Sequence, residues 1–409
     1  MADMILVINA GSSSIKFSVY GVGGESDLAL TLKGQMDGIG SHPRLRARDA
    51  GGHSLVDQMF PAAEIPDVAV ATGHVGAWLR EHLPGAVPVA IGHRVAHGGP
   101  DYSAPVMVDD DILTALERLV PLAPMHQPYN LHPIRTIQKR FPGAAQVACF
   151  DTAFHRGHPE VADRFAIPEA LYDEGVRRYG FHGLSYEYIA RALPRVAPEI
   201  AQGSVVVAHL GSGASMCAIK DGRSVDSTMA FTGLDGLPMG TRCGQIDPGV
   251  LLYLVSEKGY GAKELEHFLY HEAGLRGLSG ISNDVRDLLA SKDPRARLAL
   301  DYFVYRVARE LGALAAAMQG IDAVVLTAGI SENSPEMRAR ICAGAAWLGL
   351  RLDEAANRMG GPCISTPDSQ VSAWVIPTDE ERMIAEHTLK VWQEQEVPKH
   401  SRVSGGRDR

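Results

Sequence analysis

Short apolar runs rich in β-branched residues recur along the chain, and each one stops at a turn rich in glycine. Three of these runs cover residues 5–8, 205–208 and 323–326. Runs of about this length, bounded by turn residues, predict buried β-strands. Residues 301–319 instead repeat apolar side chains at helical spacing, which predicts an amphipathic helix. Strands mixed with helices of this length indicate an α/β fold.

A last helix is predicted from residue 380 to residue 394, and its polar tail, VPKHSRVSGGRDR, is expected to fray. Thr378 and Glu381 match a capping box at its start. This pattern gives Glu381 a local structural role and leaves Glu380 without one. A metal-binding role for Glu380 does not follow from the local sequence, because a glutamate at a helix start is also explained by the helix dipole.

Two segments of the chain are similar to each other, namely LVINAGSSSIKFSVYG and VVVAHLGSGASMCAIKDG. Both have the pattern of a strand, a Gly-Ser turn and a second strand. We interpret them as the corresponding hairpins of two related halves that share a cleft. The alternative is two unrelated hairpins that use the usual turn residues.

Composition narrows the class of protein. The chain has 409 residues, of which 45% are hydrophobic, enough for two or three globular domains. The formal net charge is −9 and no block of Lys and Arg occurs, so we expect no nucleic-acid partner. Five scattered cysteines without a CxxC pair indicate a reducing compartment. Neither a signal peptide nor a membrane-length apolar run is visible, so we expect a soluble, cytoplasmic protein.

Three turns combine small residues with hydroxyl groups, as phosphate-binding loops do. They are Asn9–Lys16 (NAGSSSIK), His209–Ser215 (HLGSGAS) and Thr327–Pro335 (TAGISENSP). Small residues let backbone N–H groups converge on an anion, and Lys16 and His209 add further donors. None of the turns matches GxxxxGK[ST] or GxGxxG. Taken singly, each one is better explained as an ordinary turn.

Four other residues carry groups suited to chemistry on anions. Arg94 and Arg242 lie near glycines, and a guanidinium suits bidentate recognition of a carboxylate or phosphate. Asp151 and His182 follow aromatic residues, and a buried Asp needs a partner or a cation. Taken singly, each of the four also fits a purely structural role.

Taken together, these segments resemble the acetate kinase family. The similarity runs almost end to end, in the order VINAGSSSIKFSVY, GHRVAHGG, LAPMHQPYNL, FDTAFH, YGFHGLSYEY, HLGSGAS, MGTRCGQIDPG, SGISNDVRD, TAGISENSPEMR and VIPTDEE. It implies the superfold of acetate and sugar kinases, heat-shock ATPases and actin, with two ribonuclease-H-like domains around a nucleotide cleft. The implied domains are residues 1–151 with 380–409 and residues 152–379. The resemblance also implies a homodimer.

The resemblance assigns roles position by position. The implied catalytic residues are Asp151, His182 and Arg242. Arg94 is the implied binding residue for the substrate carboxylate, and Asn9 and Glu380 are the implied magnesium ligands. The implied acyl pocket consists of Ala96, Met125, Phe181 and Gly233. The implied nucleotide contacts are Lys16, His209, Leu210, Gly211, Ser212, Gly213, Asp284, Val285, Arg286, Gly329, Ile330, Ser331, Glu332 and Asn333.

The implied reaction is a reversible, Mg²⁺-dependent phosphoryl transfer from ATP to acetate that yields acetyl phosphate and ADP, with Mn²⁺ as a substitute metal. Arg242, His182 and the metal would offset the negative charge that spreads over the transferring phosphoryl group. Because the attacking carboxylate is already an anion, no strong base is required. Our hypothesis is that Asp151 orients groups or supports the metal rather than accepting a proton.

Two other classes of protein fit parts of the pattern. A non-catalytic ATP-binding scaffold of the actin or chaperone kind would use the same loops, but it would not need Arg94, Arg242 and His182 together. An esterase is suggested only by His97–Gly99, and no GxSxG motif occurs. Within the family, propionate kinase is the alternative. The physiological direction and the preferred nucleotide stay open.

The sequence departs from the usual family pattern at a few positions. Ser212 stands where the family usually has Asn, Ser331 where it usually has Gly, and Asp379 where it usually has Asn or Glu. In the acyl pocket, Ala96 and Gly233 replace the valine and proline typical of acetate-selective members. The smaller side chains enlarge the pocket, and one methylene is worth only ~1–3 kcal/mol of discrimination. We therefore predict that propionate is also a substrate, used nearly as well as acetate.

Overall fold

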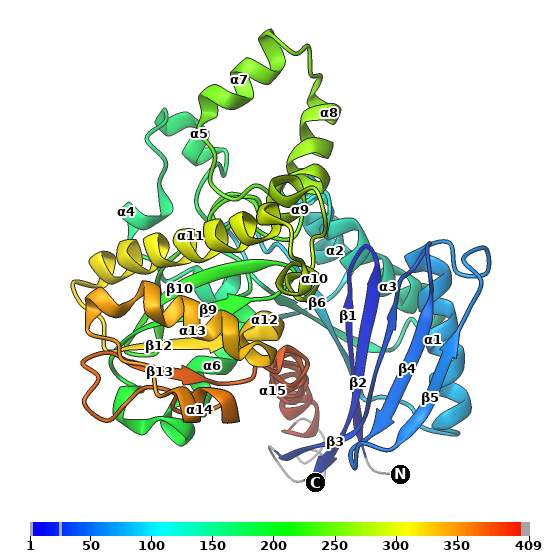
Figure 1. Ribbon diagram of the computed structural model, residues 1–409. Coiled ribbons are helices and arrows are strands. Elements are labelled where there is room, and N and C mark those ends of the chain that lie inside the picture. Colours follow the sequence, from blue (N-terminus) through cyan, green and yellow to red (C-terminus); the bar gives the residue numbers. More distant parts are fainter. Residues whose placement is uncertain (1–2, 24–26, 402–409) are drawn as a thin grey trace, which may run out of the picture. The chain divides into compact units, whose positions relative to one another are not determined.

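The structure is a computed structural model that describes residues 3–23 and 27–401, and its fold is α/β (Figure 1). The chain divides into two compact units. The first consists of Met1–Ala153 with Asp379–Arg409, and the second is Phe154–Thr378. No helix among the described residues is long and apolar enough to cross a membrane.

The first unit is built on an eight-stranded sheet of order β5-β4-β3-β2-β1-β6-β8-β7. In that order its strands are Ser54–Met59, Arg44–Asp49, Asp27–Asp37, Ser14–Gly23, Met4–Ala10, Ala90–Val95, Ala145–Phe150 and Val106–Met107. The principal helices of this unit are α1 (Val68–His82), α2 (Asp110–Arg118), α3 (Gln127–Arg140) and α15 (Glu380–Ser401). The last of these packs against β1, β6 and β8 although it lies at the other end of the chain.

The second unit is built on a five-stranded sheet of order β11-β10-β9-β12-β13. In that order its strands are Arg223–Ser227, Ala214–Lys220, Ser204–Leu210, Ala323–Thr327 and Ser372–Val375. Its longer helices are α6 (Gly183–Val196), α7 (Pro248–Ser256), α11 (Pro294–Met318) and α13 (Pro335–Gly344). Its short helices are α4 (Glu160–Asp163), α5 (Glu169–Asp173), α8 (Ala262–His267), α9 (Gly274–Ser279), α10 (Val285–Ala290), α12 (Ala328–Asn333) and α14 (Glu354–Met359).

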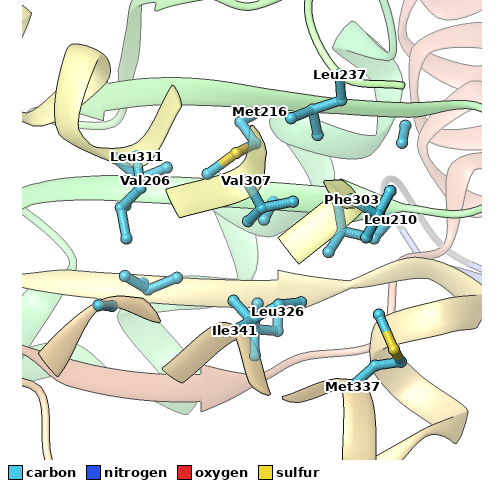
Figure 2. Packing of buried hydrophobic residues seen from close by; sticks show 14 of the residues in the cluster. Val206, Leu210, Met216, Leu237, Phe303, Val307, Leu311, Leu326, Met337 and Ile341 are labelled. Carbon is cyan, nitrogen blue, oxygen red and sulfur yellow. The ribbon is translucent and has the colours of Figure 1, made fainter. Parts of the chain in front are cut away.

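Helices cover both faces of the second sheet. On one face Phe303, Val307 and Leu311 of α11 pack against the strands, as Figure 2 shows, together with Met337 and Ile341 of α13. On the other face the apolar side of α6 packs against a separate buried cluster that includes residues of β9 and β12. Burying sheet and helix faces against one another is the main stabilising contribution in such a layered unit.

The two sheets repeat one strand order. In β3-β2-β1-β6-β8 and in β11-β10-β9-β12-β13, the first two pairings are antiparallel and the last two are parallel. The two hairpins that look alike in the sequence, β1–β2 and β9–β10, occupy equivalent places in this order. The interpretation that the chain contains two related halves is therefore supported by the topology of both sheets.

The predicted helices exist, but two boundaries differ. The helix predicted over residues 301–319 begins earlier, at Pro294, where Asp293 caps it through the N–H of Arg295. The last helix continues beyond residue 394 to Ser401, so the expected fraying is wrong for the first part of the tail. The rest of the tail lies outside the described residues.

Candidate functional site

The carboxyl ends of three neighbouring parallel strands define one edge of the first unit. β1 ends at Ala10, β6 at Val95 and β8 at Phe150, and these strands are adjacent in the sheet. Parallel strands present their carboxyl ends at one edge, where ligands bind in open α/β sheets. The predicted residues Asn9, Arg94, Ala96 and Asp151 are located at these ends.

At this edge the partly buried Arg94 forms an ion pair with the buried Asp151. Arg94 Nη2 lies 2.5 Å from Asp151 Oδ2, and its Nε lies 3.1 Å from both carboxylate oxygens. Only 1% of Asp151 is exposed. Burial raises the pKa of Asp151, and the Arg94 guanidinium opposes that rise. Burial lowers the pKa of Arg94, but the Asp151 and Glu380 carboxylates more than reverse this, so Arg94 stays charged.

The start of α15 adds two carboxylates to the same edge. Glu380 acts electrostatically on both Arg94 and Asp151. Glu381 accepts a hydrogen bond from Asn9 Nδ2 at 3.2 Å, and its Oε1 lies 3.9 Å from Lys16 Nζ. Burial raises the pKa of Glu381, and the neighbouring Glu380 raises it further. The start of α15 therefore brings two carboxylates close to the Arg94–Asp151 pair.

The capping box predicted at Thr378 and Glu381 is not formed. Asp379 caps α15, because its side chain accepts from the N–H of Arg382 at 2.9 Å. Thr378 instead accepts from the hydroxyl of Ser185 at 2.9 Å. The local pattern correctly indicated the start of a helix. The Glu381 side chain does not cap it, because its carboxylate accepts a hydrogen bond from Asn9, which is distant in sequence.

The two acyl-pocket residues predicted in the first unit differ in burial. Ala96 is buried, and its backbone N–H donates to Asn130 Oδ1 at 2.8 Å. The amide of Asn130 also donates to the carbonyl of Ala10 at 2.5 Å, so one buried side chain links the ends of β1 and β6. Met125 is half-buried and lies just before α3. Sequence reasoning quoted Asn130 only as part of a motif and missed this role.

An equivalent edge exists in the second unit. β9 ends at Leu210, β12 at Thr327 and β13 at Val375, and these strands are also parallel neighbours. The turn after β9 is closed by a bond from the N–H of Gly211 to the carbonyl of Gly213 at 3.0 Å, and Ser212 is exposed at its tip. The Leu210 side chain lies in the core, so only the backbone of Leu210 could contact a ligand.

Two imidazoles stack beside this turn. The rings of His182 and His209 are 4.3 Å apart with an interplanar angle of 18°. His182 Nδ1 lies 2.8 Å from Ser215 Oγ, and His209 Nδ1 lies 2.8 Å from Ser185 Oγ. A Cβ built on Gly213 would lie 3.3 Å from His182 Nε2, so the glycine allows the imidazole edge to approach the turn closely.

The predicted turn at Thr327–Pro335 contains a short helix, α12. Glu332 Oε1 accepts from the N–H of Ala328 at 2.7 Å and from the N–H of Thr378 at 3.2 Å, so its side chain closes the start of the helix. Asn333 donates to the carbonyl of Gly329 at 2.9 Å. Ser331 is buried in α12 and is not among the residues with positive φ, so replacing the usual glycine there costs no backbone strain. Ile330 packs partly against the core.

Arg242 belongs to another group of predicted residues. Its Nη1 donates to the carbonyl of Gly233 at 3.1 Å, and its guanidinium lies 5.8 Å from the Tyr270 ring centre. A Cβ built on Gly233 would lie 3.2 Å from Arg242 Nη1. A larger residue at position 233 would therefore crowd the Arg242 guanidinium, which the glycine avoids. Phe181, the remaining acyl-pocket residue, is buried against the core.

The Asp284–Arg286 segment begins α10. Asp284 caps this helix through the N–H of Arg286 at 2.8 Å, and Arg286 Nη2 lies 2.5 Å from the same carboxylate. The hydrogen bond from Arg286 lowers the pKa of Asp284. Val285 is buried in the core, whereas the Arg286 guanidinium is largely exposed.

The predicted residues are thus distributed over both units. The first unit carries Asn9, Lys16, Arg94, Ala96, Met125, Asp151 and Glu380, and the second carries the others. Within the first unit the structure brings Arg94, Asp151 and Glu380 together, with Asn9 and Lys16 around Glu381. Within the second it brings His182 and His209 together at the turn after β9.

Known proteins resemble this chain over almost its whole length. A sequence model of the Acetokinase family matches residues 4–386. The chain belongs to the acetokinase family. A Nitrobacter hamburgensis protein named acetate kinase is 60% identical over 404 residues, covering 98% of this chain and 100% of the relative. A Rhizobium meliloti protein of the same name is 56% identical, covering 95% and 98%.

Solved structures of the acetokinase family share the fold. A propionate kinase from Francisella tularensis superposes with a TM-score of 0.86, and an acetate kinase from Porphyromonas gingivalis with 0.82; each is 34% identical, covering 95% of this chain and 100% of that chain. The predicted superfold of acetate and sugar kinases, heat-shock ATPases and actin is therefore confirmed. Membership of the acetokinase family makes ATP the co-substrate.

Proposed function

We propose that this chain is an acetate kinase that transfers a phosphoryl group reversibly between ATP and acetate, and that it also accepts propionate. The observation that carries the proposal is the close approach of the His182 ring to the Gly213 turn in the second unit. The same chain carries, in the first unit, the partly buried Arg94 guanidinium paired with Asp151. Curated relatives named acetate kinase, 51–60% identical to the chain, support the same reaction.

The proposed roles follow from charge. Arg94 binds the substrate carboxylate, and Asp151 holds the guanidinium in a fixed plane through bonds to Nε and Nη2. His182 and Arg242 donate to the transferring phosphoryl group, whose equatorial oxygens become more negative as the reaction proceeds. Because the carboxylate nucleophile is already an anion, none of these groups needs to remove a proton.

We further propose that the turn after β9, α12 and the Asp284–Arg286 segment contact the nucleotide. The backbone N–H groups of Ser212 and Gly213 are suited to phosphate oxygens, because the turn carries no side chain larger than serine and its Gly211 N–H closes the turn. His209, which stacks on His182, donates to the same phosphates. Ser212 is shorter than the asparagine usual in the family, so its contact with the nucleotide is weaker or is made through water.

The first unit fits a divalent cation at Glu380 and Asn9. The fit rests on the chemistry of the donors, because the Glu380 carboxylate acts electrostatically on Arg94, Asp151 and Glu381 at the edge where β1, β6 and β8 end. No group of three or more His, Cys, Asp or Glu side chains able to hold a metal is found among the described residues. Mg²⁺ commonly keeps several waters and binds through one or two carboxylates plus substrate phosphates, so Glu380 and Asn9 would suffice as its protein ligands. Such an ion would supply charge stabilisation for the phosphoryl group.

We also propose that the protein is a homodimer formed through α7. This helix, PGVLLYLVS, has no buried residue, and Figure 1 shows it standing clear of the second sheet. Leu252 is 71% exposed, and Tyr253 and Val255 are each 50% exposed. An uncovered apolar helix of this kind is typical of a protein–protein interface. A second copy of the chain is the occupant that the family resemblance implies.

The proposed activity is tested by trapping the product. The purified protein is incubated with ATP, Mg²⁺ and acetate in the presence of hydroxylamine, which converts an acyl phosphate to a hydroxamate. We expect a hydroxamate that forms only when acetate and ATP are both present. ATP binding without hydroxamate would instead support the non-catalytic scaffold.

A further inference from the structure

A sealed polar cluster lies in the second unit, beside the segment that carries His182, and no role has been assigned to it so far. Its central members are His155 and Ser224, with His158 and Cys217 around them. His155 and Cys217 are fully buried, and Ser224 is 3% exposed. Buried polar groups are costly unless their donors and acceptors are matched, so the positions of the protons in this cluster are constrained.

The proton positions follow from one carbonyl group. His155 Nε2 lies 2.9 Å from the carbonyl oxygen of Phe181, which can only accept, so Nε2 carries a proton. Burial holds the pKa of His155 well below its usual range, so the ring is neutral and Nδ1 is an acceptor. Ser224 Oγ, at 2.8 Å, therefore donates to Nδ1. The serine oxygen in turn accepts from His158 Nε2 at 2.6 Å.

The carbonyl that His155 binds belongs to an unusual backbone segment. Gly180 has φ +75° and His182 has φ +56°, so the chain is left-handed on both sides of Phe181. A Cβ built on Gly180 would lie 2.6 Å from the His155 ring, which shows how closely the ring fits under the segment. A non-glycine residue in the left-handed region is strained by roughly 1 kcal/mol, so His182 needs a neighbour that holds it there.

A second path joins the cluster to the His182 side chain. The ring of His155 packs edge-on against Tyr186, with ring centres 5.6 Å apart. The Tyr186 hydroxyl lies 2.5 Å from Ser215 Oγ, which lies 2.8 Å from His182 Nδ1. His155 therefore reaches His182 in two ways. It bonds to the carbonyl of the preceding residue, Phe181, and it packs on Tyr186, which contacts Ser215, the partner of the His182 imidazole.

We propose that His155 is a positioning residue for His182: its Nε2–H fixes the Phe181 carbonyl and thereby aims the His182 imidazole at the turn that carries Gly213. The inference rests on the proposed phosphoryl-transfer function. Ser224 serves it by donating to Nδ1, which keeps the proton of His155 on Nε2. A 1 Å misplacement of a group that stabilises the transition state can cost up to about a hundredfold in rate.

The same cluster superficially resembles a hydrolytic triad, because His158 lies between Ser224 and Asp163, with its Nδ1 3.6 Å from Asp163 Oδ1. Ser224 is buried, however, and its proton is directed at His155 rather than at His158. A serine nucleophile needs an accessible oxygen and a base that accepts its proton. The arrangement therefore serves support rather than attack.

Two matched variants test the proposal. In His155→Gln the amide NH₂ reaches the position of Nε2 and can still donate to the Phe181 carbonyl, whereas in His155→Asn the shorter side chain cannot. We expect kcat within about threefold of the wild type for His155→Gln and roughly tenfold to a hundredfold lower for His155→Asn. The KM values for ATP and acetate should stay within about threefold in both variants. Thermal melting verifies that both fold.

Cys217→Ala is the control for a general loss of packing, because Cys217 contacts Ser224 without touching Phe181. It should lower the melting temperature and leave kcat within about threefold. The decisive measurement is a double-mutant cycle with His182→Ala. If His155 acts through His182, His155→Asn should cost less than about threefold in that background.

Independent, multiplying losses in the double mutant would overturn the proposal, as would equal kcat values for the Gln and Asn variants. Failure of the proposed function has a different signature, since the wild-type protein itself would then form no hydroxamate. A wild type that is active, together with a His155→Asn variant of normal kcat, contradicts the positioning role alone.

Discussion

At the scale of single residues, the Arg94–Asp151 pair carries the largest electrostatic consequence. Asp151 is buried, and it meets the guanidinium with both oxygens. An Asn at this position would keep the shape of the side chain, remove the charge and turn an amide donor toward Arg94. The arginine would then lose the partner that fixes its plane.

We therefore predict that Asp151→Asn lowers kcat/KM for acetate by about a hundredfold or more, because breaking one side of a buried charged pair costs ~2–5 kcal/mol. Steady-state kinetics at varied acetate and Mg²⁺ provide the measurement. Asp37→Asn, which removes the partner of the exposed Arg46, is the control and should have little effect. Near-normal turnover and Mg²⁺ dependence in Asp151→Asn would contradict the orienting role.

His93 provides a prediction about pH. It is buried next to Gln146, whose amide oxygen lies 2.9 Å from His93 Nε2, and burial lowers the pKa of His93 to about 4. The unfolded chain has the ordinary value, about 6.5, so folding favours the neutral ring. This contribution to stability is complete above pH 6.5 and is lost as the pH falls from 6.5 to about 4.

Between pH 7 and pH 5 the unfolding free energy of the wild type should fall more than that of His93→Gln, which cannot take up this proton. The expected difference between the two decreases is about 2 kcal/mol. Urea unfolding at the two pH values measures the difference. The exposed His53, replaced by Gln, serves as the comparison and should follow the wild type. Identical pH dependence of wild type and His93→Gln would show that burial of His93 does not favour the neutral form.

At the scale of secondary-structure elements, α12 depends on α13 for its position. Arg338 of α13 is 1% exposed, and burial lowers its pKa. Its Nη1 donates to the carbonyls of Ser331 at 2.7 Å and Glu332 at 3.0 Å, and its Nε donates to Asn357 Oδ1 at 2.7 Å. No carboxylate pairs with it among the described residues, so backbone carbonyls of α12 carry much of the compensation for this buried charge.

Arg338→Met is expected to loosen α12 and to raise the KM for ATP about tenfold. The KM for acetate should stay within about threefold, because α12 is proposed to contact the nucleotide and not the carboxylate. Arg340→Met on the same helix is the matched control, since Arg340 pairs with Glu336 at the surface. The reverse pattern, in which the KM for acetate moves and that for ATP does not, would exclude a nucleotide-binding role of α12.

The elements could be predicted from the sequence where the signal is local. The strand before each glycine turn depends on neighbouring residues, and all three of these strands are observed, as β1, β9 and β12. The helix over residues 328–333 was predicted as a loop, because a contact of Glu332 with Ala328 and with Thr378 closes it. No local pattern contains the second partner.

The candidate site shows the same limit. Motif order singled out Arg94, Asp151 and His182, because the family resemblance assigns roles to their positions. The motifs also contain Glu381 and His155, but they do not show that Glu381 contacts Asn9, 372 residues away, or that His155 contacts Ser224 and the Phe181 carbonyl. These residues act through packing and proton positions, which appear only after the chain folds.

At the scale of the whole molecule, the proposed assembly through α7 leads to a further prediction. Leu252→Glu with Val255→Glu should convert the dimer to a monomer, because two charges would have to be buried in an apolar interface. Size-exclusion chromatography with light scattering measures the mass. Leu298→Glu, an exposed leucine on α11, is the control and should leave the dimer intact. A wild-type protein that is monomeric at micromolar concentration would contradict the proposed assembly.

The central claim concerns phosphoryl transfer to a short carboxylate, and one steady-state comparison tests it most directly. The rates of acyl phosphate formation from acetate, propionate and butyrate are measured with ATP and Mg²⁺. The small residues expected in the acyl pocket, Ala96 and Gly233, predict kcat/KM for propionate within about tenfold of that for acetate, with a further fall for butyrate. A propionate value at least about a hundredfold below acetate would contradict the enlarged pocket. Formation of no acyl phosphate from any of the three would contradict the kinase function itself.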